Sequence, residues 1–362
     1  MGILCRGSPA IILLLNFTSF WSQNKADVVY FNTQYQKPGK GAEKNRGGKM
    51  TDIITLGELL IDLTQSGTDE NGNGIFTAFP GGAPANVAVA ASRLGASTGF
   101  IGKVGNDAFG RSLAETLSND GVNTDGLLVS YDVPTTMAIV SVDATGEREF
   151  SFYRNPGADT QLTAAEAASV ISGERPKILH VGSLSMTASP AKEACQVTVS
   201  QARNKGVLIS YDPNYRAALW DSEEHAIEMM KVLLPQADIL KVSDEEMEML
   251  TGISDYAEGS RALADYGVSL VMVTLGADGV FVRFGDFAEH MPGFSVEVAD
   301  TNGAGDTFAG AMLAQIARRE GLLEGLGEEE LRSFVTYANK AASLTCSRHG
   351  AIPAMPTADE LR

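Results

Sequence analysis

The stretch "DTNGAGDTFAGAM" (300–312) lies where a predicted strand meets a predicted helix, and it decides the fold assignment. "FSVEVAD" before it predicts a strand and "DTFAGAMLAQIA" predicts a helix, so Gly303, Ala304 and Gly305 lie at the turn into that helix. A helix start exposes unpaired backbone N–H groups at the positive end of the helix dipole. Because these three residues have almost no side chains, an anion such as a phosphoryl group can approach those N–H groups.

Asp306 follows directly, within the first turn of the same predicted helix. A carboxylate does not bind phosphate, but it can accept the proton of a hydroxyl group that attacks a bound phosphoryl group. Asp also caps helix N-termini, so the residue types alone leave a purely structural role open. The stretch is not a P-loop, because no Gly-Lys-Ser/Thr follows, and it does not match GxGxxG either.

Composition and charge limit the partners of the chain. The 362 residues are 44% hydrophobic and 7% aromatic, and the formal net charge is −17. This length suits one large α/β domain with an appendage, or two modest domains. The acidic charge argues against nucleic acid or an anionic membrane surface as the main partner. An anionic ligand would therefore need compensation from backbone N–H groups, cations or a metal.

The cysteines predict a reducing compartment. Cys5, Cys195 and Cys346 are too few and too scattered for a disulfide framework or a zinc site. Reduced thiols are the rule in the cytosol. We therefore predict a cytoplasmic protein.

The first 49 residues differ from the rest of the chain. The apolar run at 9–21 is shorter than the roughly 20 residues that a membrane-spanning helix needs, and no clear small-residue cleavage site follows it. Residues 34–49 are polar, Gly-rich and basic, a composition typical of disorder. We expect residues 1–49 to be a disordered or non-native extension of a functional domain at 50–362, with an export signal as the alternative.

Strand and helix patterns alternate along most of the chain. Apolar, β-branched runs predict strands at 52–64, 97–105, 177–186, 206–216, 237–246 and 269–284. Helical spacing predicts helices at 83–95, 107–121, 307–321 and 331–350. This alternation favours an α/β fold with a mainly parallel central sheet flanked by helices. Hairpin patterns near 62–80 and 130–155 fall outside it and predict a small separate β-sheet.

Polar and Gly-rich residues follow several of these strands, where ligands of open α/β sheets bind. Gly82 and Asn86 suit contacts with sugar hydroxyls, and Asp62 at the end of the first predicted strand suits two neighbouring hydroxyls. Glu246 in "SDEEMEML" could orient water around magnesium, and the glycines of "VTLGADGV" could lie near a nucleotide. Each of these residues could instead have a purely structural role, as part of a turn, as a solvent-exposed acid or as part of a hairpin.

"GGAPANVAVAASRLG" (81–95) and "DTNGAGDTFAGAM" together resemble the two signatures of the PfkB, or ribokinase-like, family of carbohydrate kinases. They occur in the family's order, about 220 residues apart, and the resemblance runs from about Met50 to Pro356. It implies a ribokinase-like fold with a β-sheet lid, ATP and magnesium as cofactors, potassium in some members, and homodimers formed through the lid.

The resemblance also implies residue roles. Asp306 resembles the catalytic base, and Gly303, Ala304 and Gly305 resemble the anion hole for the transferring phosphoryl group. Sugar contacts are implied for Asp62, Gly82, Asn86 and Arg154. Contacts on the ATP side are implied for Thr274, Gly276, Asn339, Ser243 and Arg216, and a water-mediated magnesium contact for Glu246. Asp300 and Asn302 match positions that hold a monovalent cation in some members. Ser243 replaces the Asn of the family's Asn-x-x-Glu motif.

"GELLIDL", "GGAPANVA" and "DPNYR" are most similar to fructokinases, which implies ATP-dependent phosphorylation of D-fructose to fructose 6-phosphate. Ketodeoxygluconate kinases share "DPNYR", whose Arg216 would meet an anionic group, so that activity or another sugar or nucleoside kinase is the alternative. A catalytically inactive sugar-binding regulator is a further one. A nicotinamide oxidoreductase would need a GxGxxG turn after the first strand, and "TLGELLID" lacks it.

Overall fold

The structure is a computed structural model that describes residues 51–142 and 148–362. The predicted extension at 1–49 and the turn of the hairpin predicted near 130–155 lie outside the described residues. None of the helices in the described ranges is long and apolar enough to cross a membrane.

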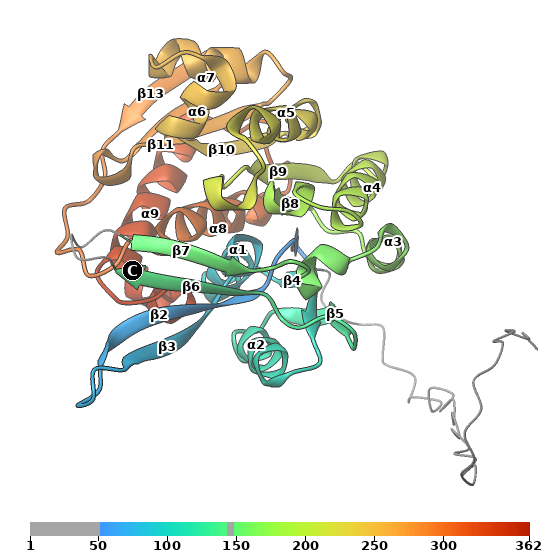
Figure 1. The fold of residues 1–362 in the computed structure, drawn as a ribbon. Coiled ribbons are helices and arrows are strands. Elements are labelled where there is room, and N and C mark those ends of the chain that lie inside the picture. Colours follow the sequence, from blue (N-terminus) through green and yellow to red (C-terminus); the bar gives the residue numbers. More distant parts are fainter. Residues whose placement is uncertain (1–50, 143–147) are drawn as a thin grey trace, which may run out of the picture. The chain divides into compact units, whose positions relative to one another are not determined.

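In the described part of the chain, nine strands form the main sheet in the order β13-β12-β11-β10-β9-β8-β1-β4-β5 (Figure 1). Neighbours from β5 to β11 run parallel, and β12 and β13 are antiparallel. The strands are β1 (Ile53–Leu56), β4 (Thr98–Gly105), β5 (Asn123–Ser130), β8 (Ile178–Gly182), β9 (Leu208–Asp212), β10 (Ile239–Ser243), β11 (Leu270–Thr274), β12 (Val280–Phe284) and β13 (Phe287–Met291). The predicted parallel sheet is thus confirmed.

Helices cover both faces of this sheet because successive strand residues face opposite sides. Ile53 and Ile178 pack in the cluster formed with α1 (Ala83–Arg93), α8 (Ala304–Arg318) and α9 (Glu328–Cys346). Ile54 and Leu179, one residue further along, pack in the cluster on the other face. That face is covered by α3 (Ala164–Gly173), α4 (Ala191–Asn204), α5 (Glu223–Leu233) and α6 (Asp244–Thr251). At the edges, α2 (Ala108–Asn119) contacts β5, and α7 (Tyr256–Ala264) contacts β11 and β12.

A second, smaller sheet lies beside the main one (Figure 1). Its order is β3-β2-β6-β7, from β2 (Leu60–Thr68), β3 (Gly74–Gly81), β6 (Met137–Val142) and β7 (Arg148–Tyr153). These strands come from the two hairpin regions of the sequence, so the predicted small sheet is confirmed. We call it the lid sheet.

Two strand predictions were wrong. The run at 52–64 is not one strand, because the chain leaves the main sheet after β1 and enters the lid sheet as β2. Gly57 allows this passage, since a Cβ there would lie 2.5 Å from Cγ of Pro84. Asp62 therefore lies within a lid strand rather than at the end of the first strand. Residues 294–300, predicted as a strand, form no strand, because they follow the edge strand β13 and several of them line a cavity instead of pairing.

Candidate active site

The site lies at the carboxyl ends of the parallel strands, where β1, β8, β9, β10 and β11 all finish at one edge of the sheet. Two cavities of the described residues meet there. Asn302, Gly303 and Asp306 line the smaller cavity, and Thr301, Ala304 and Gly305 line the larger one. The turn into α8 therefore forms the wall between the two cavities.

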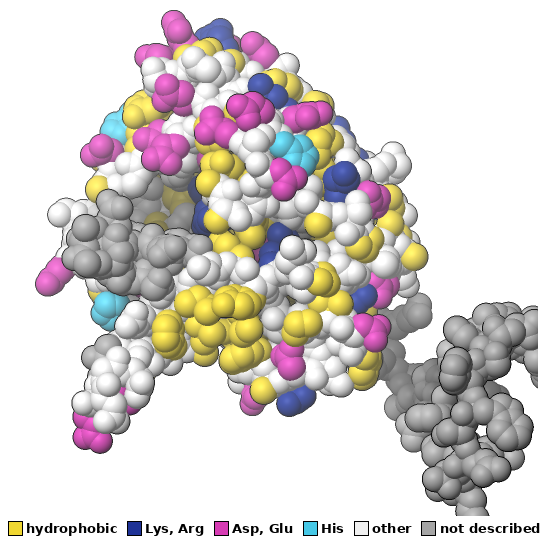
Figure 2. Space-filling model, viewed as in Figure 1, with side chains coloured by type: hydrophobic (Ala, Val, Ile, Leu, Met, Phe, Trp, Pro, Cys, Tyr) yellow, Lys and Arg dark blue, Asp and Glu magenta, His cyan; other side chains and the backbone are white. Residues whose placement is uncertain are grey.

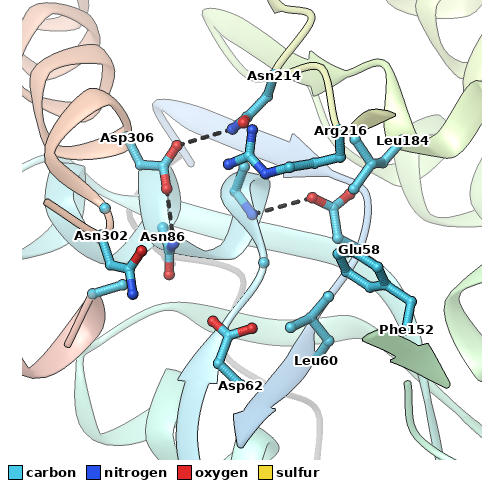
Figure 3. Close-up of a pocket in the computed structure, with 14 residues that line it drawn as sticks. Glu58, Leu60, Asp62, Asn86, Phe152, Leu184, Asn214, Arg216, Asn302 and Asp306 are labelled. Carbon is cyan, nitrogen blue, oxygen red and sulfur yellow. Dashed lines mark hydrogen bonds between the residues drawn. The ribbon is translucent and has the colours of Figure 1, made fainter. Parts of the chain in front are cut away.

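Polar side chains dominate the smaller cavity, which has a volume of about 100 Å³ (Figure 3). They come from β2, from α1, from the loops after β1 and β9, and from the start of α8. The polar side chains are Glu58, Asp62, Asn86, Asn214, Arg216, Asn302 and Asp306. Such a set of acceptors and donors can hold a compact polyhydroxylated molecule.

The larger cavity has a volume of about 530 Å³ and a more apolar lining. Its walls are the segment before α8, the turn after β11, and α8 and α9. The lining includes Thr274, Gly276, Phe294, Val296, Val298, Phe308, Asn339 and Cys346. Asn339 Nδ2 donates to the carbonyl oxygen of Pro292, 3.0 Å away, and so ties α9 to the loop across the cavity. A cavity of this size suits a flat heterocycle with a phosphate tail.

The predicted anion-binding turn has the required backbone. Gly303 caps α8 in the left-handed region (φ 75°), and a Cβ there would lie 2.8 Å from Cβ of Ala351, so only glycine fits. The Ala304 N–H makes a long bond of 3.4 Å to Thr301 O. In the described part of the chain, no carbonyl or side chain accepts from the N–H groups of Gly305 and Asp306. These groups remain able to bind an anion.

The carboxylate of Asp306 faces the smaller cavity and is held through both oxygens (Figure 3). Asn86 Nδ2 donates to Oδ2 at 2.8 Å, and Asn214 Nδ2 donates to Oδ1 at 3.3 Å. Burial raises the pKa of Asp306, although these two bonds and the charges of Lys241 and Arg216 oppose the shift. A buried and oriented carboxylate of this kind can accept a proton from a hydroxyl group in the cavity.

Asn86 is positioned by the first turn of α1. The turn begins after Gly82, whose φ of 109° and close approach to the carbonyl oxygen of Glu58 exclude a side chain. Asn86 Nδ2 donates one of its two hydrogens to Asp306, so the amide can offer its oxygen and one further N–H to a ligand. That oxygen is buried and has no hydrogen-bond partner among the described residues.

Asp62 and Arg216 bring opposite charges to the same cavity. Burial raises the pKa of Asp62 to about 6, helped by the charges of Asp306 and Asp300 and opposed by Arg216. Arg216 is exposed and its side chain lies beside the cavity (Figure 3). The sequence placed Arg216 among the nucleotide contacts, whereas the structure brings it to the smaller, polar cavity.

A buried ion pair lies beneath the turn into α8. Lys241 Nζ lies 3.0 Å from Asp212 Oδ2, and both side chains are almost fully buried. Burial lowers the pKa of Lys241, but the charges of Asp212, Glu246 and Asp306 outweigh it, so the net shift is upward and the ammonium keeps its charge. A Cβ on Gly305 would lie 3.0 Å from this Nζ, so a side chain there would press on the buried ion pair.

Thr274, Gly276 and Asn339 line the larger cavity, on the side where ATP contacts were predicted. Gly82, Asp62 and Asn86 line the smaller one with Asp306, as the sugar contacts require. The structure thus brings most of the predicted residues to two neighbouring cavities. Their individual roles stay predictions.

Arg154 does not line either cavity. Its Nε donates to Asp159 Oδ2 at 2.7 Å, Nη1 to Thr187 Oγ1 at 2.7 Å, and Nη2 to the carbonyl oxygen of Leu184 at 2.9 Å. The guanidinium is therefore buried in a network behind Leu184, which does line the smaller cavity. No sequence pattern indicates that Asp159 binds this guanidinium.

Ser243 and Glu246 also lie outside both cavities. They form a capping box at the start of α6, in which Ser243 N donates to Glu246 Oε2 at 2.8 Å. The other oxygen, Oε1, accepts from Tyr215 N at 2.7 Å. The described residues contain no cluster of three or more acidic, His or Cys side chains that could hold a metal. The water-mediated magnesium contact of Glu246 stays a prediction.

Asp300 stabilises the turn that leads to the anion-binding glycines. Its Oδ1 accepts from Asn302 N and its Oδ2 from Gly350 N, both at 3.0 Å. These contacts do not select a cation, and the monovalent-cation role of Asp300 and Asn302 stays a prediction.

Sequence reasoning missed three residues of the site. Glu58 and Asn214 line the smaller cavity, and Lys241 lies under the turn into α8. Glu58 Oε1 accepts from Ala83 N at 3.1 Å, and burial raises the pKa of Glu58 to about 7. Charged residues at the ends of apolar runs, Glu58 in "TLGELL" and Lys241 in "ADILKVS", were the available signals.

Comparison with known proteins agrees with this geometry. The family model described as pfkB family carbohydrate kinase matches residues 50–358. Fructokinase-1 of Zea mays is 42% identical over 313 residues, which is 85% of this chain and 96% of that protein.

Solved structures are similar over the same range. Fructokinase with bound ATP from Xylella fastidiosa is 33% identical, with a TM-score of 0.79 over 86% of this chain and 97% of that one. A fructokinase double mutant from Vibrio cholerae O395, with fructose, ADP and potassium ion bound, is 31% identical, with a TM-score of 0.76 over 87% and 98%. Both the matched family model and these relatives extend over almost all of the described chain, so this chain belongs to the pfkB family of carbohydrate kinases.

Proposed function

We propose that this chain transfers the γ-phosphoryl group of MgATP to the 6-hydroxyl group of D-fructose, giving fructose 6-phosphate and ADP. The observation that carries the proposal is the position of Asp306 on the wall between a small polar cavity and a larger apolar one. Relatives named fructokinase, with ATP or with fructose and ADP in their solved structures, support this choice of substrates.

The sugar would occupy the smaller cavity. Asn86 Oδ1 can accept a hydrogen bond from one hydroxyl, because it is buried and has no partner among the described residues. Asp62 can accept from two neighbouring hydroxyls when its carboxylate is ionised. Gly82 leaves the backbone open on the same side.

Phosphoryl transfer would occur across the turn at 303–305. The sugar oxygen forms a bond to the γ-phosphorus, the bond from this phosphorus to the bridging oxygen of ADP breaks, and the hydroxyl proton passes to Asp306. The N–H groups at the start of α8 would stabilise the charge on the transferring group. The ammonium of Lys241 beneath Gly305 adds positive charge at the same point.

The lid sheet would close over the sugar. Leu60 and Asp62 of β2 and Phe152 of β7 line the smaller cavity, so the lid sheet contributes part of its wall. Closure would exclude water and so limit hydrolysis of ATP.

A coupled assay of ADP release tests the proposed function. The screen compares fructose, ribose, ketodeoxygluconate, inosine and fructose phosphates at fixed MgATP. We expect the highest kcat/KM with fructose. ADP release with none of these acceptors would indicate a binding protein without kinase activity and would overturn the proposal.

Ketodeoxygluconate is the second candidate, because a cation lies beside the smaller cavity. The guanidinium of Arg216 would pair with the carboxylate of such an acid sugar. In the same screen, a higher kcat/KM with ketodeoxygluconate than with fructose would favour this alternative.

We also propose a homodimer formed through the lid sheet. Three large hydrophobic side chains on lid strands are exposed: Ile75, Phe76 and Tyr153. Figure 2 shows hydrophobic side chains gathered over the region of this sheet. An exposed hydrophobic patch such as the one in Figure 2 marks a contact surface between proteins.

Three further predictions complete the proposal. Residues 50–362 are the functional domain, which the family match at 50–358 supports.

The enzyme is cytoplasmic, which is consistent with Cys195 and Cys346 being free thiols. Potassium binds beside Asp300, as the potassium ion in the solved Vibrio cholerae relative suggests.

A further inference from the structure

The loop between β9 and the short helix at Ala217–Leu219 carries two side chains of the smaller cavity, Asn214 and Arg216. Residues 213–216 have no regular structure, so their position depends on individual contacts. Asn214 has a φ of 48°, a left-handed conformation that Asn adopts at some cost. In this conformation its Nδ2 reaches Asp306 Oδ1.

Hydrogen bonds on both halves hold this loop, and Tyr215 packs against the core cluster on one face of the main sheet. On its first half, Ser183 donates to the carbonyl oxygen of Pro213, and Asn214 N donates to Asp212 Oδ1 at 3.2 Å. On its second half, Tyr215 N donates to Glu246 Oε1 at 2.7 Å, and the carbonyl oxygen of Arg216 accepts from Leu219 N at 2.9 Å. Because Tyr215 lies between Asn214 and Arg216, its bond to Glu246 bears on the position of both cavity side chains.

Glu246 is well suited to hold the loop. It is only 6% exposed, and it lies in the first turn of α6. Its Oε2 completes the capping box with Ser243 N, and its Oε1 is used entirely outside α6. A capping box needs only one oxygen of the carboxylate, so the second bond is an additional function of this residue.

We propose that Glu246 is a positioning residue of the sugar site: its carboxylate holds the Tyr215 amide, and so places Asn214 against Asp306 and Arg216 beside the smaller cavity. This inference rests on the proposed function. It differs from the water-mediated magnesium contact that the family resemblance implies. The two roles have different consequences, because a positioning role affects the sugar, whereas a metal role affects the magnesium requirement.

The test compares Glu246→Gln with a matched control, Glu166→Gln. Glu166 forms the same capping box with Thr163 at the start of α3, but it contacts Lys103 and lines neither cavity. Each change leaves the side chain one acceptor oxygen, which is enough for a capping box. Only in Glu246→Gln must that one oxygen serve both Ser243 N of the capping box and Tyr215 N of the loop. Two carboxylate oxygens serve these two N–H groups in the wild type.

We expect Glu246→Gln to raise the KM for fructose about tenfold or more, with an unchanged half-saturating concentration of free magnesium. Glu166→Gln should leave both values at the wild-type level. Hydrogen exchange of peptides covering 213–217 should be faster in Glu246→Gln than in wild type or the control. If Glu246→Gln does not fold, Glu246→Asp, which is too short for both bonds, replaces it.

An unchanged KM for fructose, or a shift in the half-saturating magnesium concentration, would overturn the inference. Wild-type protein that releases no ADP with any sugar would sink the proposed function instead. In that case hydrogen exchange still tests the contact between Glu246 and the Tyr215 amide. Equal exchange of the peptides covering 213–217 in wild type and Glu246→Gln would refute the role of this contact in holding the loop.

Discussion

Two amide side chains, rather than cations, touch the carboxylate of Asp306. Asn86 and Asn214 donate to its two oxygens and fix its orientation without a neutralising charge. Burial raises the pKa of Asp306, so its carboxylate is a stronger base than that of an exposed Asp. Proton transfer from a sugar hydroxyl to Asp306 is then easier than transfer to the carboxylate of an exposed Asp.

At the scale of single residues, local motifs in the sequence were the reliable guide. Asp306, Gly303 and Asn86 were found because each belongs to a short stretch with glycines next to a helix start. Lys241 and Asn214 were missed because their partners, Asp212 and Asp306, come from other segments of the chain. Arg154 was assigned to the sugar, and its contacts with Asp159 and Leu184 appear only in three dimensions.

The charge of Asp62 should make sugar binding depend on pH. Its pKa is raised to about 6, so the carboxylate is ionised above this pH and protonated below it. Only the ionised form accepts hydrogen bonds from two hydroxyls through both oxygens. We expect the KM for fructose to rise as the pH falls through about 6.

Asp62→Asn provides the comparison for this prediction. The variant should have a KM raised about tenfold at pH 7.5, with little further change down to pH 5. The measurement is the KM for fructose across this pH range in both proteins. Parallel profiles would show that another group controls the binding of the sugar.

At the scale of elements, the start of α8 depends on glycine for two different reasons. Gly303 is needed for its left-handed backbone, and Gly305 for the space that the ammonium of Lys241 occupies. The sequence indicated a turn with almost no side chains here. It did not indicate that Ala351 lies against Gly303 and Lys241 against Gly305. The splitting of residues 52–64 between two sheets was hidden for a similar reason, since the close contact of Gly57 with Pro84 lies between distant segments.

Gly305→Ala should damage the anion-binding turn. The new Cβ would lie 3.0 Å from Lys241 Nζ, so either the ammonium or the turn must move. We expect kcat to fall at least tenfold and the KM for ATP to rise, because the N–H groups no longer face the phosphoryl group. Steady-state kinetics with saturating fructose measure both values.

Gly173→Ala is the control for this substitution. Gly173 lies at the end of α3, and a Cβ there meets no atom within 4 Å. Wild-type kinetics are expected for this variant. Kinetics of Gly305→Ala that match the control would show that the turn tolerates a side chain.

Lys241→Met should destabilise the fold. The change leaves the buried carboxylate of Asp212 without its partner 3.0 Å away, which costs about 3–5 kcal/mol. Lys177→Met is the control, because Lys177 and Asp52 are also 3.0 Å apart but partly exposed, and such pairs contribute about 0–1 kcal/mol. Urea unfolding gives both free energies, and equal losses would contradict the importance of burial here.

At the scale of the whole molecule, the alternation of strands and helices predicted the main sheet, and the hairpin patterns outside this alternation predicted the lid sheet. The shapes of the two cavities could not be predicted, because their walls combine segments that are more than 200 residues apart, such as Asn86 and Asp306. Cavity shape depends on side-chain packing between such segments, which periodicity does not report.

The lid-sheet dimer gives a prediction at this scale. Sedimentation should show a dimer for wild type and a monomer for Phe76→Glu, since a charge on the exposed lid face opposes its burial. Tyr266→Glu, with a side chain that is also exposed but outside the lid sheet, should remain a dimer. A monomeric wild type, or a dimeric Phe76→Glu, would contradict association through the lid sheet.

The most direct test of the account is the turnover of Asp306→Asn with fructose and MgATP. The amide keeps the shape of the side chain but cannot accept the proton, so kcat should fall by about two or more orders of magnitude. Binding of fructose and of ATP, measured by calorimetry, should stay close to wild type. A variant that turns over fructose as fast as wild type would show that the carboxylate between the two cavities is not the base.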